Sequence, residues 1–103
     1  MDIFSALADP NRRQIVELLA SKGQLSASDI CTQFKVSPPA ISQHLKILRE
    51  AGAVTMQKKA QQRIYQINKS KISELEKWIK KLVELWDSRF LALDKLLEQE
   101  KNK

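Results

Sequence analysis

The segment SPPAISQHLKILREAG, residues 37–52, collects side chains suited to binding through hydrogen bonds and charge. Built as a helix at about 100° per residue, it turns one set outward: Pro39, Gln43, Lys46 and Glu50, flanked by Ser42 and Arg49. The amide of Gln43 can donate and accept hydrogen bonds at once, and the ammonium of Lys46 can pair with an anion. No acidic residue precedes Glu50 on this face, whereas ordinary solvent-exposed faces mix Glu with Lys.

Start and stop signals in the same segment define the helix that must position these side chains. Ser37 is a favoured N-cap residue, and the two prolines after it suit a first turn, where backbone N–H groups have no helical partner. Gly52 is typical of the position just past a helix end. An apolar stripe at helical spacing marks the buried side: Ile41, Leu45 and Leu48. The pattern predicts a short helix over residues 38–51.

Positive charge is concentrated in the middle of the chain. The formal charge at pH 7 is +6, and residues 35–68 carry +5, against −1 for residues 1–34 and +2 for residues 69–103. A concentrated basic region is the electrostatic footprint of a protein that binds a polyanion. A basic face that is merely solvated has the same charge, so charge alone leaves both interpretations open.

Length and composition fit one small domain, because 103 residues with 43% apolar residues can bury a modest core. The single cysteine, Cys31, excludes an intrachain disulfide and fits a reducing compartment. No stretch approaches the ~18 consecutive apolar residues of a membrane span, and the first residues lack the pattern of a signal peptide. We therefore expect a cytoplasmic protein with a single domain over residues 1–103.

Two helices are predicted near the start of the chain. Residues 2–8 have apolar side chains at helical spacing, and Asp9-Pro10 places a capping residue before a first-turn proline. The second helix runs to about Ser21, and Gly23 ends it.

A third helix is predicted over residues 27–34, because Ser26 and Asp29 resemble a capping box. Its expected buried residues are Ile30, Cys31 and Phe34. Only three residues separate it from the helix that begins at Pro38, which is the spacing of a helix-turn-helix.

A β-hairpin is predicted over residues 54–67. VTMQKK and QRIYQI place β-branched and aromatic residues at roughly alternate positions, on either side of a polar tip around Ala60-Gln61. The tip lacks the glycine or asparagine expected of a tight hairpin turn, so the register stays open. Tyr65, in the second strand, is expected in the core, with a hydrogen bond to a phosphate as its alternative role.

Nothing interrupts the helical pattern between residues 71 and 100. A helix of that length spans about 45 Å, which is more than a single small domain can cover. A second copy of the chain is the natural cover, because the charges are interspersed and not one-sidedly basic as on a membrane-surface helix, which is the alternative. The predicted dimer interface joins this helix and the first one: Ile3, Phe4, Leu7, Leu82, Leu85, Trp86, Phe90, Leu93, Leu96 and Leu97.

Three stretches resemble the ArsR-type winged-helix repressors of bacteria: ALADPNRRQIVELL (6–19), LSASDICTQFKVSPPAISQHLKILREAGAV (25–54) and RIYQI (63–67). The resemblance covers about two-thirds of the chain, and SPPAISQHLKILREAGAV is its most specific part. It implies a mainly α fold with a small β-hairpin, which is a winged helix-turn-helix with a long C-terminal dimerisation helix. Relatives often have glycine where this chain has Lys35 and Ala60.

The helix face and the resemblance together imply that residues 38–51 enter the major groove of DNA, while the hairpin contacts the backbone or minor groove. Gln43 can pair bidentately with adenine, and Lys46 can reach guanine or phosphate. His44 is interpreted as a packing residue or a phosphate contact. The alternative role of the hairpin cations is only to make the hairpin soluble. The predicted DNA-binding residues are Ser37, Pro38, Pro39, Ala40, Ser42, Gln43, His44, Lys46, Lys58, Lys59 and Arg63.

No metal site and no catalytic group are predicted. Metal-sensing relatives carry a Cys-x-Cys pair at the start of the third helix, where this chain has Ser26 and Ser28. Soft-metal sites need two or three thiolates or imidazoles, and Cys31 and His44 are the single cysteine and histidine. No glycine-rich phosphate loop and no nucleophile with a histidine–acid partner is present. We expect no metal, no cofactor and no enzymatic activity, and ALADPNRR resembles a branch of small autorepressors without metal sites.

The sequence thus predicts a homodimeric repressor that binds double-stranded DNA at an inverted-repeat operator. The helix-turn-helix is expected at about residues 27–51, the wing at about 54–67, and the dimerisation helices at about 2–8 and 71–100. Two alternatives stay open. A helical interaction module would bind an acidic protein or a membrane surface through its basic face, and a DNA-compacting protein would bind without sequence preference.

Overall fold

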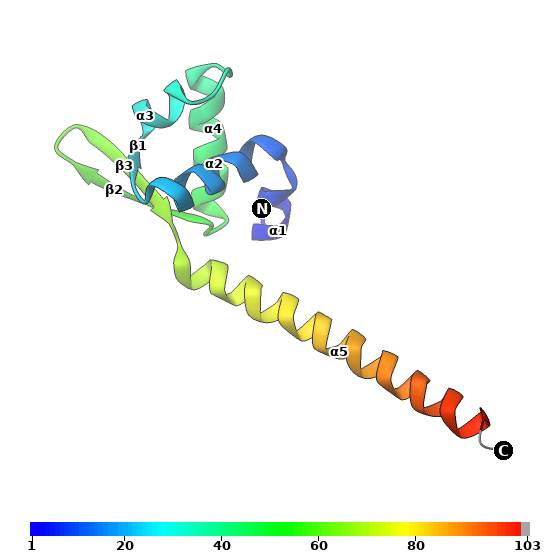
Figure 1. The fold of residues 1–103 in the computed structure, drawn as a ribbon. Helices are drawn as coiled ribbons and strands as arrows, with labels where there is room; N and C mark the ends of the chain where they lie inside the picture. The colour runs from blue at the N-terminus through cyan, green and yellow to red at the C-terminus, as the bar shows by residue number, and fades with distance from the viewer. Residues whose placement is uncertain (102–103) are drawn as a thin grey trace. The chain divides into compact units, whose positions relative to one another are not determined.

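The computed structural model describes residues 1–101 as five helices and a small sheet (Figure 1). In chain order the elements are α1 (Ile3–Ala8), α2 (Pro10–Lys22), β1 (Leu25–Ser26), α3 (Ala27–Thr32), α4 (Pro38–Glu50), β2 (Val54–Lys59), β3 (Gln62–Ile67) and α5 (Lys69–Lys101). The mainly α fold with a hairpin and a long last helix is as predicted. The chain divides into two compact units, Met1–Ile72 and a second that begins at Ser73.

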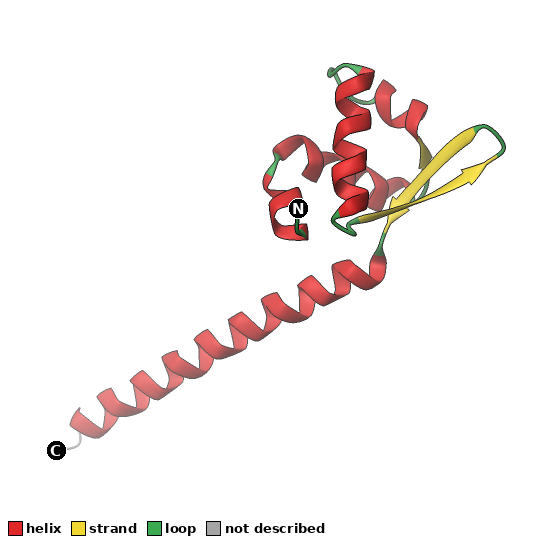
Figure 2. Ribbon diagram, turned by 180° about the vertical axis from the view of Figure 1, so that it is seen from behind, coloured by secondary structure: helices red, strands yellow, loops and turns green. Residues whose placement is uncertain are grey.

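The first unit contains a three-stranded antiparallel sheet with the strand order β1-β3-β2. β2 and β3 form the predicted hairpin, which appears as the two long yellow arrows in Figure 2. β1 pairs with the other edge of β3, where Leu25 lies opposite Tyr65. This strand was not predicted, because two residues are too few to show the alternation that identifies a strand.

The hairpin turn is the two-residue loop Ala60-Gln61, because Lys59 pairs directly with Gln62. Ala60 has a φ of 55°, the only positive φ of a non-glycine residue within residues 1–101. A positive φ at the first loop residue gives the twist that two-residue hairpins need, which explains why glycine is common there. This turn sets the register that the sequence left open. Lys35, the other position where relatives often have glycine, stays outside the left-handed region.

Polar side chains cap the early helices where the sequence predicts caps. The carboxylate of Asp9 accepts hydrogen bonds from the backbone N–H groups of Asn11, at 2.8 Å, and Arg12, at 3.2 Å. The hydroxyl of Ser26 accepts one from the backbone N–H of Asp29 at 3.1 Å. Each cap satisfies N–H groups that have no partner within the helix.

α3 is shorter than predicted, since it ends at Thr32 and not at residue 34. The backbone N–H of Gln33 bonds to the carbonyl of Ile30 at 3.0 Å, so the helix closes with a tighter, three-residue turn. Five residues and not three therefore connect α3 to α4. Ile30 is buried as expected, whereas Cys31 and Phe34 are only half-buried. Phe34 lies beyond the end of the helix, which would otherwise have carried it inward.

The core of the first unit packs α4 against α1, α2, α3 and β2. Its largest fully buried side chains are Ile15, Leu19, Ile30, Ile41, Leu45, Leu48 and Val54. Full burial of one such side chain stabilises the fold by about 1.5–3 kcal/mol relative to exposure. Three of these residues belong to α4, so the core holds that helix firmly in place.

α5 begins at Lys69, and the Asn68 side chain accepts a hydrogen bond from the Lys71 backbone N–H at 3.4 Å. Its 33 residues span about 50 Å at 1.5 Å per residue. Every side chain from residue 76 to residue 100 is exposed. This stretch of helix contributes nothing to a buried core, which is why the second compact unit consists of α5 residues. The single domain over residues 1–103 stays a prediction. Within residues 1–101, charged residues interrupt the apolar runs, and no helix meets the length and hydropathy needed to cross a membrane.

Candidate nucleic-acid interface

The first turn of α4 is exposed and held by its cap. The hydroxyl of Ser37 accepts a hydrogen bond from the backbone N–H of Ala40 at 3.3 Å, and the Ser37 carbonyl accepts one from Ile41 at 3.0 Å. Pro38 and Pro39 occupy the first two helical positions, where their fixed φ suits the helix. The start of the helix thus presents small, rigid groups to solvent.

The end of α4 closes in a Schellman motif that leads directly into β2. Gly52, with a φ of 85°, donates its N–H to the Arg49 carbonyl at 3.0 Å, and Ala53 donates to Leu48 at 2.9 Å. A Cβ at Gly52 would lie 3.7 Å from the Lys71 side chain, which is an ordinary contact. Backbone conformation, and not space, therefore requires glycine here.

The two sides of α4 divide as the sequence predicts. Ile41, Leu45 and Leu48 are buried, whereas Ala40 and His44 are half-buried. The exposed residues before Glu50 are Pro38, Pro39, Ser42, Gln43, Lys46 and Arg49. Hydroxyl, amide and cationic groups thus share one accessible face.

The strand register separates the three cations of the hairpin. Lys58 lies opposite Arg63 on the same hairpin face as the Met56–Tyr65 pair, two residues nearer the turn on each strand. Lys59 alternates to the other face. Like charges directly opposite each other destabilise a hairpin, so the Lys58–Arg63 pair has a cost that no neighbour in the sheet offsets.

A cleft of ≈ 380 Å³ lies between the exposed face of α4 and the wing, which we define as β2, β3 and their turn. Its lining residues are Ala27, Pro39, Ser42, Gln43, Leu45, Lys46, Arg49, Arg63 and Tyr65. Three are cations and none is a carboxylate. Within residues 1–101, the side chains of these cations have no ion pair or hydrogen bond. The cleft is thus a concave, uncompensated positive surface, suited to an anion.

Two sets of matches decide the relationship of this fold to known proteins. A family model described as "Bacterial regulatory protein, arsR family" matches residues 9–55. The transcriptional repressor SdpR of Bacillus subtilis (strain 168) is 33% identical over 87 residues, which cover 84% of this chain and 96% of SdpR. The chain belongs to the ArsR family. The arsenical resistance operon repressor of Escherichia coli (strain K12) is 34% identical, over 84% of this ArsR-family chain and 71% of that repressor.

A solved structure supports the same assignment. The ArsR-like transcriptional regulator from Rhodococcus sp. RHA1 superposes with a TM-score of 0.80 and 28% identity, over 91% of this chain and 88% of that one. This likeness confirms the winged helix-turn-helix. As an ArsR-family member the chain is a DNA-binding transcriptional regulator and not an enzyme.

The structure brings several predicted DNA-binding residues of this ArsR-family chain into one cleft: Pro39, Ser42, Gln43, Lys46 and Arg63. It separates Lys59 from them, on the other face of the hairpin. Arg49 also lines the cleft and is absent from the predicted set. The signal was available, because Arg49 follows Lys46 by three residues and falls on the same exposed side of the helix.

His44 lies at the edge of the exposed face. It is half-buried, and its Nδ1 atom is buried with no hydrogen-bond partner within residues 1–101. The pKa of Asp9 is lowered, mainly by the hydrogen bond from the Arg12 backbone N–H and to a smaller extent by the charges of Arg12 and His44. The burial of Nδ1 fits the packing role, and the phosphate contact stays a prediction.

The positions that correspond to the Cys-x-Cys pair of metal-sensing relatives are hydroxyl residues with local roles. Ser26 is buried and caps α3, while Ser28 is exposed. Cys31 is half-buried on the same helix. Within residues 1–101, no three His, Cys, Asp or Glu side chains gather as a metal site would require.

Proposed function

We propose that this ArsR-family regulator is a homodimeric repressor that reads an inverted-repeat operator through α4 and the wing. The observation that carries the proposal is the cleft that Gln43 and Lys46 of α4 line together with Arg63 of the wing. Small residues in the first turn of α4 permit close approach to base edges, where an amide pairs with adenine and a cation with guanine or phosphate. The helix-turn-helix is assigned to residues 27–51 and the wing to residues 54–67.

The charge pattern supports a polyanionic partner. Lys58 and Arg63 lie opposite each other on the cleft side of the hairpin. A phosphate group close to both side chains offsets their mutual repulsion. The repulsion that destabilises the unbound hairpin therefore favours binding of an anion.

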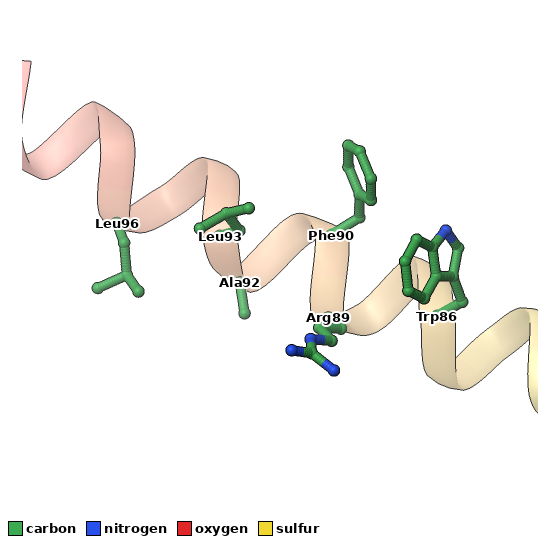
Figure 3. Close-up of a pocket in the computed structure, with 6 residues that line it drawn as sticks. All are labelled: Trp86, Arg89, Phe90, Ala92, Leu93 and Leu96. Atoms are coloured by element: carbon green, nitrogen blue, oxygen red, sulfur yellow. The ribbon is translucent and has the colours of Figure 1, made fainter.

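The apolar surface of α5 supports a second copy of the chain as the other partner. A shallow groove along the helix is lined by Trp86, Arg89, Phe90, Ala92, Leu93 and Leu96. Figure 3 shows the rings of Trp86 and Phe90 on one side of the helix, with ring centroids 6.0 Å apart. Trp86 is 61% exposed, and large exposed apolar patches of this kind mark interaction surfaces.

The spacing along α5 favours the pairing of two nearly straight helices. Apolar residues recur with a period of eleven: Leu75, Ile79 and Leu82, then Trp86, Phe90 and Leu93, then Leu97. An eleven-residue repeat corresponds to about 3.67 residues per turn, which is close to the 3.6 of an unstrained helix. The stripe therefore stays on one side over the whole length.

The predicted contribution of α1 to the dimer differs between its residues. Ile3 is 5% exposed and packs within its own unit, so it offers little area to a partner. Phe4 is 51% exposed and Leu7 is half-buried, so these two stay in the proposed interface.

Selection of bound sequences from a random duplex pool tests the proposal. We expect an inverted repeat whose half-sites are centred about 34 Å apart, or a multiple of it, because two α4 helices are held at a fixed separation. Recovery of no preferred sequence with measurable DNA binding would favour a compacting protein. Absence of DNA binding would favour the interaction module.

A further inference from the structure

Arg49 is a cation of the cleft that the predicted DNA contacts do not include. It is exposed, lies one turn beyond Lys46 on α4, and lines the cleft together with Arg63 of β3. Two guanidinium groups and one ammonium thus border a single hollow of ≈ 380 Å³, although they come from separate elements.

The lining of the cleft suits an oxyanion. Ser42 and Gln43 add a hydroxyl and an amide, and the floor includes Leu45, 1% exposed, and Tyr65, 5% exposed. An apolar floor limits solvent screening of the cations above it. A guanidinium fork matches phosphate geometry bidentately, which an ammonium cannot do.

The position of the cleft indicates which phosphate it receives. It lies between α4, which is proposed to enter the major groove, and the wing, which is proposed to contact the adjacent backbone. A DNA strand that borders the groove must pass between these two elements. The cations of the cleft therefore meet a phosphodiester, whereas Gln43, on its α4 side, is left for a base edge.

We propose that this cleft binds one backbone phosphodiester in each half-site, with Arg49 and Arg63 as its guanidinium ligands. The proposal rests on the proposed DNA-binding function and adds to it a phosphate site and a residue outside the predicted contacts. Arg49 fixes the depth and register of α4 in the groove, because phosphate contacts position a reading helix without specifying sequence.

If Arg49 only stabilised the end of α4, a different experimental result would be expected. A cation in the last turn of a helix interacts favourably with the helix dipole, and Arg49 occupies that turn of α4. Loss of this interaction lowers stability but leaves the salt dependence of DNA binding unchanged. The two roles are therefore separable.

The experiment compares Arg49→Gln and Arg49→Lys with Arg13→Gln, which removes an exposed arginine of α2 that does not line the cleft. Binding to the selected operator and to random duplex is measured over a salt series. Arg49→Gln is expected to weaken both by about fivefold. It should also flatten the slope of log K against log salt by about 0.9 for each phosphate that the variant no longer neutralises. Arg49→Lys should keep the slope with weaker binding, and Arg13→Gln should change neither quantity.

A second arm first measures the unaltered protein, so its main result holds even where a variant folds poorly. Operator phosphates are replaced one at a time by neutral methylphosphonates. At one position in each half-site, this replacement is expected to weaken binding of the wild-type protein about fivefold. The same replacement should not change binding of Arg49→Gln, because two groups that interact with each other are not additive in a double-mutant cycle.

Unchanged affinity and salt slope in Arg49→Gln, or a loss confined to the operator, would overturn the phosphate site. A phosphonate scan in which Arg49→Gln keeps the wild-type sensitivities would overturn it as well. Wild-type protein that binds no duplex would instead contradict the proposed function, so the two failures are distinct.

Discussion

Gln43 is the residue of α4 whose chemistry best suits a base edge, because its exposed amide lies one turn into the helix and lines the cleft. We predict that Gln43→Ala lowers the preference for the operator over random DNA by about 1–3 kcal/mol and leaves binding to random DNA unchanged. Titration of both duplexes measures the preference.

The matched control is Gln14→Ala, which removes an exposed amide from α2 and should change neither affinity. Equal weakening of Gln43→Ala on both duplexes would mean that this side chain contacts the backbone and not a base.

The sequence predicted which side chains of α4 are exposed, but it did not predict which cations of the wing share a face. Each residue of a helix is rotated by about 100° from the one before it, so the position of the buried stripe determines which residues are exposed. The exposure of Ser42, Gln43 and Lys46 was predictable in this way. On the wing, direction depends on strand register, and register depends on the turn. Because Ala60 adopts its positive φ without being glycine, the sequence did not reveal that Lys58, and not Lys59, lies on the same face as Arg63.

At the scale of elements, the link between α4 and the wing depends on one backbone conformation. Gly52→Ala is predicted to destabilise the protein by about 1 kcal/mol, because the φ of 85° is unfavourable for alanine while the space for a Cβ is adequate. Urea unfolding at fixed protein concentration measures the loss.

Gly23→Ala serves as its comparison, because Gly23 has a φ of 90° and no atom within 4 Å of the position that an alanine methyl would take. Similar losses in both variants would confirm backbone strain as the cause. A neutral Gly52→Ala variant would contradict it and indicate that the turn rearranges.

Elements with strong end signals were predicted well, and those without them were not. α2 and α4 start at a capping residue followed by proline and end at a positive-φ glycine or just before one. No glycine or proline directly follows Thr32 to mark the end of α3. The end was therefore predicted from periodicity alone, and the predicted helix was two residues too long. β1 depends on pairing with distant β3, which local patterns do not encode.

At the scale of the whole molecule, α5 is expected to hold two DNA-binding units together. We predict that removal of residues 85–103 leaves a monomer whose first unit retains its helices, because that unit has its own core. Operator affinity should fall by about 10²–10⁴-fold, since the second half-site is no longer bound intramolecularly. Sedimentation and titration of half and full operators measure both effects.

A full-length control keeps the helix intact. Phe90→Glu with Leu93→Glu places charges in the groove of α5 and should give the same monomeric, weakly binding protein. Wild-type protein that sediments as a monomer at micromolar concentration would refute the dimer.

The division of the chain into two units was the least predictable feature at this scale. An unbroken helical pattern gives no sign of where a helix stops contributing to the core. The boundary near residue 72 follows from burial, because side chains beyond residue 75 are all exposed up to residue 100.

The distribution of aromatic residues gives the two units different optical properties. Both tryptophans, Trp78 and Trp86, lie on α5, whereas the single tyrosine, Tyr65, is buried in the sheet of the first unit. Indole emission shifts to shorter wavelength when water is excluded, so tryptophan fluorescence reports what covers α5. The unlabelled protein thus carries its own spectroscopic probe of assembly.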